Sequence, residues 1–189
     1  MAFQETARRH AWKGHFWKDY VSSVKALRGW EDDNGFLVNY VGHPLQGSTT
    51  GFIFVQNHAA GRNLTFENTR PYWTSRLKSM AWSAAYSTYF EIGFPFSEAA
   101  LGNVGHPKRN SKMAYVDLVM TPVLGTAVLV GEDALDKHVI RRLEGKGCNQ
   151  PWRAVVRGLL NPSRSMANMV RGRVPWHRDT RDGITDCRP

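Results

Sequence analysis

Residues 39–51, with the sequence NYVGHPLQGSTTG, include Pro44 and the glycines Gly47 and Gly51, whose spacing predicts how helices pack in this protein. Pro44 suits the first position of a helix, so we expect a helix over residues 44–57. Gly47 and Gly51 lie four residues apart and share one face of that helix. Without side chains on that face, another backbone can approach closely.

His43 stands immediately before this helix. The partial positive charge at a helix N-terminus disfavours imidazolium, so we expect a neutral His43 that could act as a base or a ligand. The alternative is a histidine that is hydrogen-bonded in a core and has no further role.

A second helix is predicted over residues 71–91, again after a proline. Small polar residues recur on it every four positions and form one slowly rotating face suited to close helix contact. These residues are Ser75, Ser79, Ser83, Ser87 and, at the end, Glu91. The helix C-terminus disfavours a carboxylate by about 0.3–1 kcal/mol, so Glu91 either has a tertiary partner or is solvated at a fraying end.

A third helix is predicted over residues 122–145, with Thr121 as its N-cap and Pro122 as its first residue. Its apolar stripe is predicted to consist of Leu124, Val128, Leu135 and Val139.

Glu132 is expected to face inward with that stripe, whereas Asp133 is expected to pair with Lys137 on the outside. A half-buried Glu132 needs a hydrogen-bonding or cationic partner, or it stays protonated. His43, Arg76 or an N-terminal lysine could supply that partner.

One histidine and three acids are the candidate catalytic residues: His43, Glu91, Asp117 and Glu132. They suffice for a general acid–base pair, or for a metal site of carboxylate oxygens and imidazole, and the metal and any cofactor stay unknown. The fingerprints of zinc peptidases, serine hydrolases and nucleotide-binding loops are absent from the sequence.

The remaining pattern predicts three more helical pieces. They are a basic amphipathic helix within residues 3–28, a short turn after Ser97, and a basic helix over residues 151–170 that is interrupted at Asn161-Pro162. The predicted class is therefore all-α, a compact domain of four to five helices. The longest apolar stretch, residues 114–131, contains Asp117 and falls short of a clean transmembrane span.

The positive charge lies at the two ends of the chain. Of the net +9 in 189 residues, residues 1–30 carry +4, residues 150–189 carry +5, and residues 31–149 are neutral. This distribution predicts three segments: a basic N-terminal helix (1–30), a helical core (31–149) and an arginine-rich C-terminal helix and tail (150–189). Two cysteines, Cys148 and Cys187, are too few for a disulfide scaffold but leave one bridge open. The N-terminal residues lack the apolar run of a signal peptide.

Several short motifs occur in a fixed order over residues 36–172. They are His43-Pro44-x-x-Gly47, an aromatic-rich helix ending in Phe90-Glu91, Ser97-Glu98, Asp117-Leu118-Val119-x-Thr121-Pro122-x-x-Gly125, Gly131-Glu132 and Asn161-Pro162-Ser163-Arg164. Taken in this order, they resemble a bacterial family catalogued as domain of unknown function 3943. The resemblance implies an exported cell-envelope protein, periplasmic or outer-membrane associated, with no assigned reaction and no established catalytic residue.

Together these features predict a membrane-associated envelope protein whose basic ends contact anionic lipid. The predicted lipid-binding residues are Arg153, Arg157, Arg164, Arg171 and Arg173, interleaved with Trp152, Leu159, Leu160, Met166, Met169 and Val170. The alternative is a lipid or envelope hydrolase that uses the four candidate catalytic residues. Nucleic-acid binding rests on net charge alone and is disfavoured, and protein partners stay open.

Overall fold

The computed structural model describes residues 16–31, 34–101, 113–145, 149–181 and 183–184. Every regular element within these residues is helical, which confirms the all-α class. The described residues form six helices longer than eight residues, somewhat more than the four to five expected. The first half of the predicted 3–28 helix, as well as Cys148 and Cys187, lies outside the described residues.

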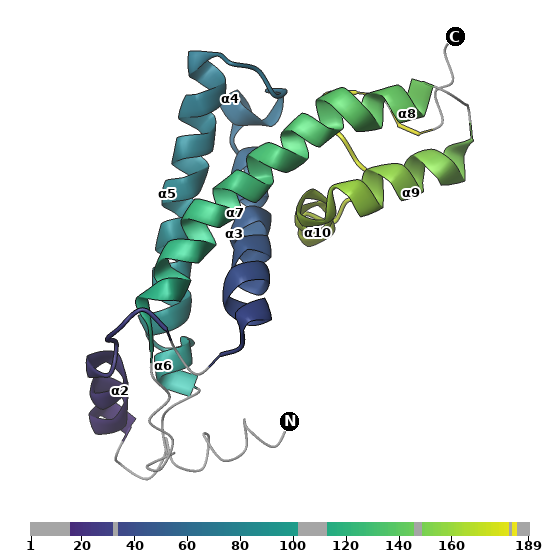
Figure 1. The fold of residues 1–189 in the computed structure, drawn as a ribbon. Helices are drawn as coiled ribbons and strands as arrows, with labels where there is room; N and C mark the ends of the chain where they lie inside the picture. Colours follow the sequence, from purple (N-terminus) through teal and green to yellow (C-terminus); the bar gives the residue numbers. More distant parts are fainter. Residues whose placement is uncertain (1–15, 32–33, 102–112, 146–148, 182, 185–189) are drawn as a thin grey trace.

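Three helices pack side by side at the centre of the molecule (Figure 1). They are α3 (His43–Asn57), α5 (Arg70–Ile92) and α7 (Tyr115–Leu135). The π-helical turn η1 (Val38–Gly42) leads into α3, the short α4 (Ala59–Arg62) lies between α3 and α5, and α6 (Glu98–Leu101) follows α5. The prolines therefore predicted the beginnings of α3 and α5 to within one residue.

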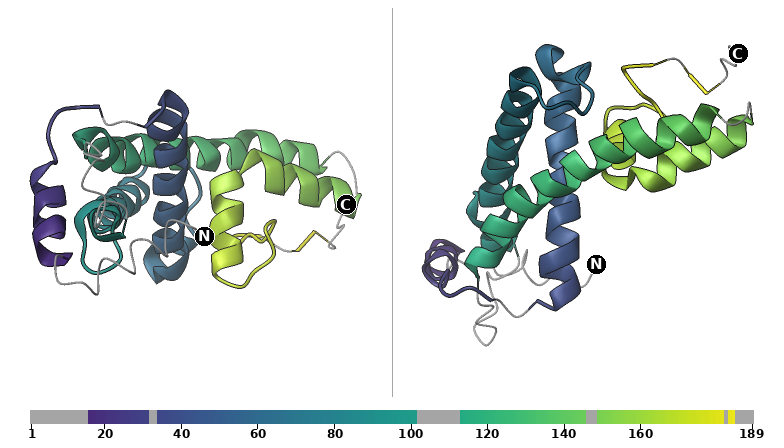
Figure 2. Two further views of the ribbon diagram at one scale, coloured as in Figure 1. Left: turned by 90° about the horizontal axis from the view of Figure 1, so that it is seen from below. Right: turned by 45° about the horizontal axis from the view of Figure 1, so that its top comes forward.

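The central helices are extended at both ends by further elements. Through the π-helical turn η2 (Asp136–Ile140), α7 continues into α8 (Arg141–Gly145), and α9 (Gln150–Leu160) runs alongside that arm (Figures 1 and 2). The chain breaks at Asn161, as predicted, and α10 (Pro162–Val170) packs against α3. At the other end α2 (Phe16–Lys25) lies beside α6.

The predicted beginning of the third helix was wrong. The helix α7 starts at Tyr115, after the extended Ala114, so Thr121 and Pro122 lie inside it rather than at its N-terminus. A proline inside a helix removes one backbone hydrogen bond and costs about 3 kcal/mol. Both residues are buried against the neighbouring helices, so tertiary packing offsets that cost.

The backbones of α3 and α7 meet where neither helix has a side chain. A Cβ atom added at Gly47 would lie 1.8 Å from the carbonyl oxygen of Thr121, and one added at Gly125 would lie 2.8 Å from the backbone of Gly47. On the neighbouring face of α3, a Cβ atom at Gly51 would lie 2.7 Å from the hydroxyl oxygen of Ser79. The glycines therefore provide the close approach that their spacing predicted.

The serine face of α5 is buried along its whole length, as its spacing predicted. Ser83 donates a hydrogen bond to the carbonyl oxygen of Gly47 (3.2 Å), and Ser87 donates one to the carbonyl oxygen of Asp117 (3.1 Å). Ser83 and Ser87 thus satisfy their hydroxyls on neighbouring helix backbones while keeping the helices close.

The prediction for the inward face of α7 was wrong. Three of the four stripe residues are exposed, namely Leu124 (37%), Leu135 (41%) and Val139 (38%). The buried residues of α7 are instead mostly small or polar: Val116, Asp117, Thr121, Pro122, Gly125, Leu129, Glu132 and Asp133. The helix α5 is arranged in the same way, because its serine face is inside and its large apolar residues Trp73, Leu77, Trp82, Tyr89 and Phe90 are exposed.

Alanine at Gly47 should therefore destabilise the fold by about 3 kcal/mol or more, because its methyl group would overlap the backbone of α7. Gly131→Ala is the matched control, since Gly131 is also inside a helix but nothing lies within 4 Å of an added Cβ atom. It should be neutral or stabilise by up to about 1 kcal/mol through helix propensity. Urea unfolding followed by circular dichroism measures both, and equal stability of the two variants would contradict the packing.

Candidate functional site

Three helix ends bring together three of the four candidate catalytic residues. His43 is the first residue of α3, Asp117 lies in the first turn of α7, and Glu91 is next to last in α5. All three are buried, with 7%, 2% and 2% of their surface exposed. The expectation that Glu91 turns inward to meet a tertiary neighbour agrees with this position.

The side chains of His43 and Asp117 lie at hydrogen-bonding distance, and that of Glu91 lies close to both. The Nε2 atom of His43 lies 3.1 Å from Oδ1 of Asp117. Its other ring nitrogen, Nδ1, lies 3.2 Å from the hydroxyl oxygen of Thr121, one turn further along α7. One nitrogen or carboxylate oxygen from each of His43, Glu91 and Asp117 falls within 4.8 Å of the others, so these three residues could hold a metal ion.

Contacts on both sides fix the imidazole ring. The Thr121 hydroxyl can accept from Nδ1 or donate to it, depending on the tautomer. A bonded Nδ1 leaves Nε2 directed at the carboxylate of Asp117. Ser87, which donates a hydrogen bond to the carbonyl oxygen of Asp117, is also buried.

Glu132 does not belong to this group. It lies fifteen residues after Asp117 on the same helix, roughly 22 Å along the axis at 1.5 Å per residue. Its carboxylate accepts hydrogen bonds from the backbone N–H groups of Ser163 (2.9 Å) and Arg164 (3.1 Å) at the beginning of α10. Burial raises the pKa of Glu132, and those N–H groups oppose the rise.

Glu132 therefore caps a helix N-terminus, where a carboxylate is favourable. The expectation that it needs a partner was right, but the expected partners, His43, Arg76 or an N-terminal lysine, were wrong, because the backbone of α10 supplies the donors.

Asp133 was predicted to be on the outside, and that was wrong as well. It is buried and accepts hydrogen bonds from the Tyr72 hydroxyl (2.9 Å) and the Arg76 side chain (2.8 Å), and it forms an ion pair with Arg164. Lys137 instead donates to the carbonyl oxygen of Phe66 (2.7 Å). Asp133 thus ties α5, α7 and α10 together.

A third polar cluster joins the C-terminal tail to the α7–α8 arm. Asp136 accepts from Arg178 (2.9 Å) and from Arg181, and Glu144 accepts from Arg157 (2.7 Å) and Arg181 (3.1 Å). Burial alone would raise the pKa of both carboxyl groups, but these arginine contacts hold each pKa below its usual value.

Several arginines predicted to bind lipid are used inside the molecule. Arg157 is 3% exposed and directs its guanidinium at Glu144, so its assignment as a lipid contact was wrong. Arg164 pairs with Asp133 and lies 4.7 Å above the ring of Phe52, while Arg171 pairs with Asp179 (2.9 Å). Arg153 donates to the carbonyl oxygen of Glu144 (3.2 Å). Counting charge by segment missed the contacts of Arg153, Arg157 and Arg164 because their acidic partners lie in the 31–149 segment.

Arg173 is exposed, as are the apolar residues with which the arginines alternate in sequence.

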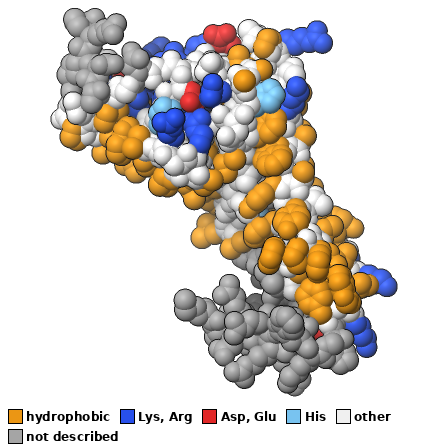
Figure 3. All heavy atoms as spheres, turned by 180° about the vertical axis from the view of Figure 1, so that it is seen from behind, with side chains coloured by type: hydrophobic (Ala, Val, Ile, Leu, Met, Phe, Trp, Pro, Cys, Tyr) orange, Lys and Arg blue, Asp and Glu red, His pale blue; other side chains and the backbone are white. Residues whose placement is uncertain are grey.

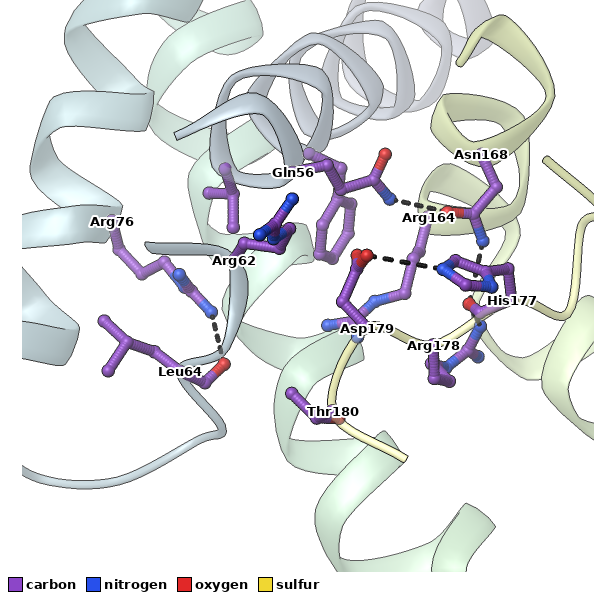
Figure 4. A pocket seen from close by; sticks show the side chains of 12 residues that line it. Gln56, Arg62, Leu64, Arg76, Arg164, Asn168, His177, Arg178, Asp179 and Thr180 are labelled. Atoms are coloured by element: carbon purple, nitrogen blue, oxygen red, sulfur yellow. Dashed lines mark hydrogen bonds and ion pairs between the residues drawn. The ribbon is translucent and has the colours of Figure 1, made fainter. Parts of the chain in front are cut away.

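One cavity lies where four arginines gather between α3, α5, α10 and the C-terminal tail (Figure 4). Arg62, Arg76, Arg164 and Arg178 line it, together with Asp179 and His177, which lie 3.3 Å apart. Its volume of about 20 Å³ has room for one water molecule, which is too small for a lipid headgroup or a substrate.

Thr121 was not predicted from sequence to be a partner of His43. The buried ion-pair clusters around Asp133 and Asp136, which include Arg178 and Arg181, were not predicted either. One signal could have found the acids, because they continue the three- and four-residue spacing of Asp117, Thr121, Gly125 and Leu129 along α7. Their arginine partners come from distant segments and leave no local signal.

Comparison with known proteins gives no relative: no family model, curated protein or solved structure matches this chain.

The substitution Asp136→Asn should destabilise the protein by about 3–5 kcal/mol at pH 7, because it leaves the buried Arg178 without its carboxylate partner. Glu67→Gln is the control, since Glu67 is largely exposed and only 3.8 Å from Lys137, and it should cost under about 1 kcal/mol. Urea unfolding measures both.

The same cluster sets the direction of the pH dependence. Because the pKa values of Asp136 and Glu144 are lowered in the folded state, their contribution is complete at neutral pH. It is lost as the pH falls below the ordinary carboxyl pKa of about 4 toward the folded-state values. Stability that falls equally steeply with acid in wild type and Asp136→Asn would contradict this account.

Proposed function

We propose that this chain is a membrane-associated protein of the bacterial cell envelope that inserts apolar helix faces into an anionic bilayer. The observation that carries the proposal is the distribution of side chains. Serine, histidine, acids and arginine supply many of the buried contacts between the helices, around a small apolar core of Phe52, Leu129 and Ala167, whereas many large apolar side chains lie on the outer faces. Water opposes such an arrangement and lipid favours it, because helices in lipid associate through small and polar residues.

The exposed apolar residues form an extensive surface. On the face of the molecule that Figure 3 shows, hydrophobic side chains form a broad band below a cluster of Lys and Arg side chains. The exposed side chains of α9, α10 and the segment that follows include Trp152, Val155, Leu159, Met166, Met169, Val170 and Val174. Apolar surface gathered in this way is typical of membrane or protein interaction sites.

The helical segment Tyr115–Gly145 supports the proposal by its composition. It is the one helix among the described residues that is long and apolar enough to cross a membrane, with a mean hydropathy of 1.5. Only a third of its apolar window is buried. A helix in the core of a soluble protein would have most of that window covered.

Positive charge accompanies the apolar faces at one end of the molecule. Lys18, Lys25 and Arg28 are exposed on or just after α2, together with Trp17 and Val21. Lysine, arginine and tryptophan on one short helix suit the headgroup region of an anionic membrane.

The alternative predicted from sequence, a lipid or envelope hydrolase, needs its four polar groups beside a cavity large enough for substrate. The His43–Asp117 contact has the geometry of a base and its orienting acid. Glu132, however, accepts hydrogen bonds from the backbone of α10 far from the other three residues, and those three are at most 7% exposed. Membrane association therefore explains more of the observed side-chain arrangement than the hydrolase alternative does.

The chain should float with vesicles of phosphatidylglycerol and phosphatidylcholine, and binding should weaken as salt rises. The double variant Lys18→Gln/Lys25→Gln should bind about 20–30-fold more weakly, at about 1 kcal/mol for each lysine. Lys137→Gln is the control, because Lys137 donates to Phe66 within the protein. Failure of the wild type to bind at low salt would refute the proposal.

Removing an outward apolar side chain should affect membrane binding and folding differently. Leu159 is 75% exposed, so Leu159→Ser should change stability in water by no more than about 0.5 kcal/mol. In lipid the same side chain would be buried, and its loss should weaken vesicle binding about tenfold or more. Flotation and urea unfolding of the same samples separate the two effects, and unchanged flotation would argue against contact through α9.

A further inference from the structure

We propose that His43, Glu91 and Asp117 bind one divalent transition-metal ion at the point where α3, α5 and α7 meet. The proposal is independent of membrane association. It rests on the convergence of one imidazole and two carboxylates, ligands that such an ion uses, carried by three different helices and buried together.

The distances suit a shared ion. Metal–ligand bonds of about 2.0–2.1 Å place neighbouring ligand atoms about 2.9–3.4 Å apart in octahedral or tetrahedral geometry. The Nε2 atom of His43 and Oδ1 of Asp117 are 3.1 Å apart, within that range. The group as a whole spans no more than 4.8 Å, so a small side-chain rotation brings the Glu91 carboxylate to the same ion.

The ligand set indicates the class of ion. One imidazole and two carboxylates suit Zn²⁺, Mn²⁺ or Fe²⁺ better than Ca²⁺ or Mg²⁺, which prefer oxygen ligands alone. Three protein ligands also leave coordination positions for water.

Two neighbouring hydroxyl groups hold two of the three ligands in place. Nδ1 of His43 lies 3.2 Å from the Thr121 hydroxyl, and the donation of Nδ1–H to that oxygen would fix the tautomer in which Nε2 faces the ion. The peptide group of Asp117 is held as well, because its carbonyl oxygen accepts from Ser87. Thr121 and Ser87 therefore act as positioning residues for two of the ligands.

The location gives the ion a structural consequence. His43 begins α3, Glu91 is next to last in α5 and Asp117 lies in the first turn of α7. One ion would join those ends, so it should stabilise the folded state by binding it preferentially. At a metal concentration about 100 times the Kd, the Tm should rise by about 5–10 °C.

The test is isothermal titration of the full chain with Zn²⁺ and, separately, Mn²⁺ after removal of metal with a chelator. We expect one ion for each chain. His43→Gln, Glu91→Gln and Asp117→Asn should each weaken binding by more than about 100-fold, and Thr121→Val by about 10–100-fold. His177→Gln is the matched control, because His177 also lies near an aspartate (3.3 Å) but on the surface, and it should bind as the wild type does.

A second measurement needs no variant. Crystals of the wild type grown with Zn²⁺ should show an anomalous peak between His43, Glu91 and Asp117. Absence of saturable binding, binding that survives all three ligand substitutions, or a peak located elsewhere would each overturn the proposal.

Discussion

The contact between Gly47 of α3 and Gly125 of α7 is the constraint on which the rest of the structure depends. Backbone meets backbone there, and a single added methyl group would overlap the carbonyl of Thr121. Such a contact fixes the register of the two helices, because no neighbouring position of α7 could come as close. His43 lies one turn before Gly47, and Thr121 lies one turn before Gly125, so the same register sets the imidazole beside Thr121 and Asp117.

The close approach also explains why the interior is polar. Helices this near to one another favour serine hydroxyls at the contact, so many of the large apolar residues of α5 and α7 lie outside, while Leu129 stays buried beside Gly51. In water each exposed apolar side chain forgoes about 1.5–3 kcal/mol of burial. Lipid would remove that loss, so the packing as well as the composition supports the proposed membrane association.

Features coded by neighbouring residues were predictable from the sequence, and those coded by distant pairs were not. Pro44, Pro71 and Asn161-Pro162 marked helix boundaries correctly, and the glycine and serine spacings identified two contact faces. The face of α7 was misassigned because the close approach of the helices selects small and polar residues for the contact rather than the apolar stripe. The partners of Glu132 and Asp136 lie thirty to forty-five residues away, where periodicity carries no information.

The buried carboxylates of Asp133 and Asp136 are paired with arginine side chains. Charges can remain inside a molecule with an apolar exterior only if each is matched within the protein, since neither lipid nor a dry interface would solvate them. Asp133 with Arg76 and Arg164, and Asp136 with Arg178 and Arg181, meet that requirement through residues from α5, α10 and the tail. The positive charge of the C-terminal segment therefore neutralises the acids of α7 in addition to any role toward lipid. Arg178 and Arg181 of the tail are accordingly part of the packed structure around Asp136.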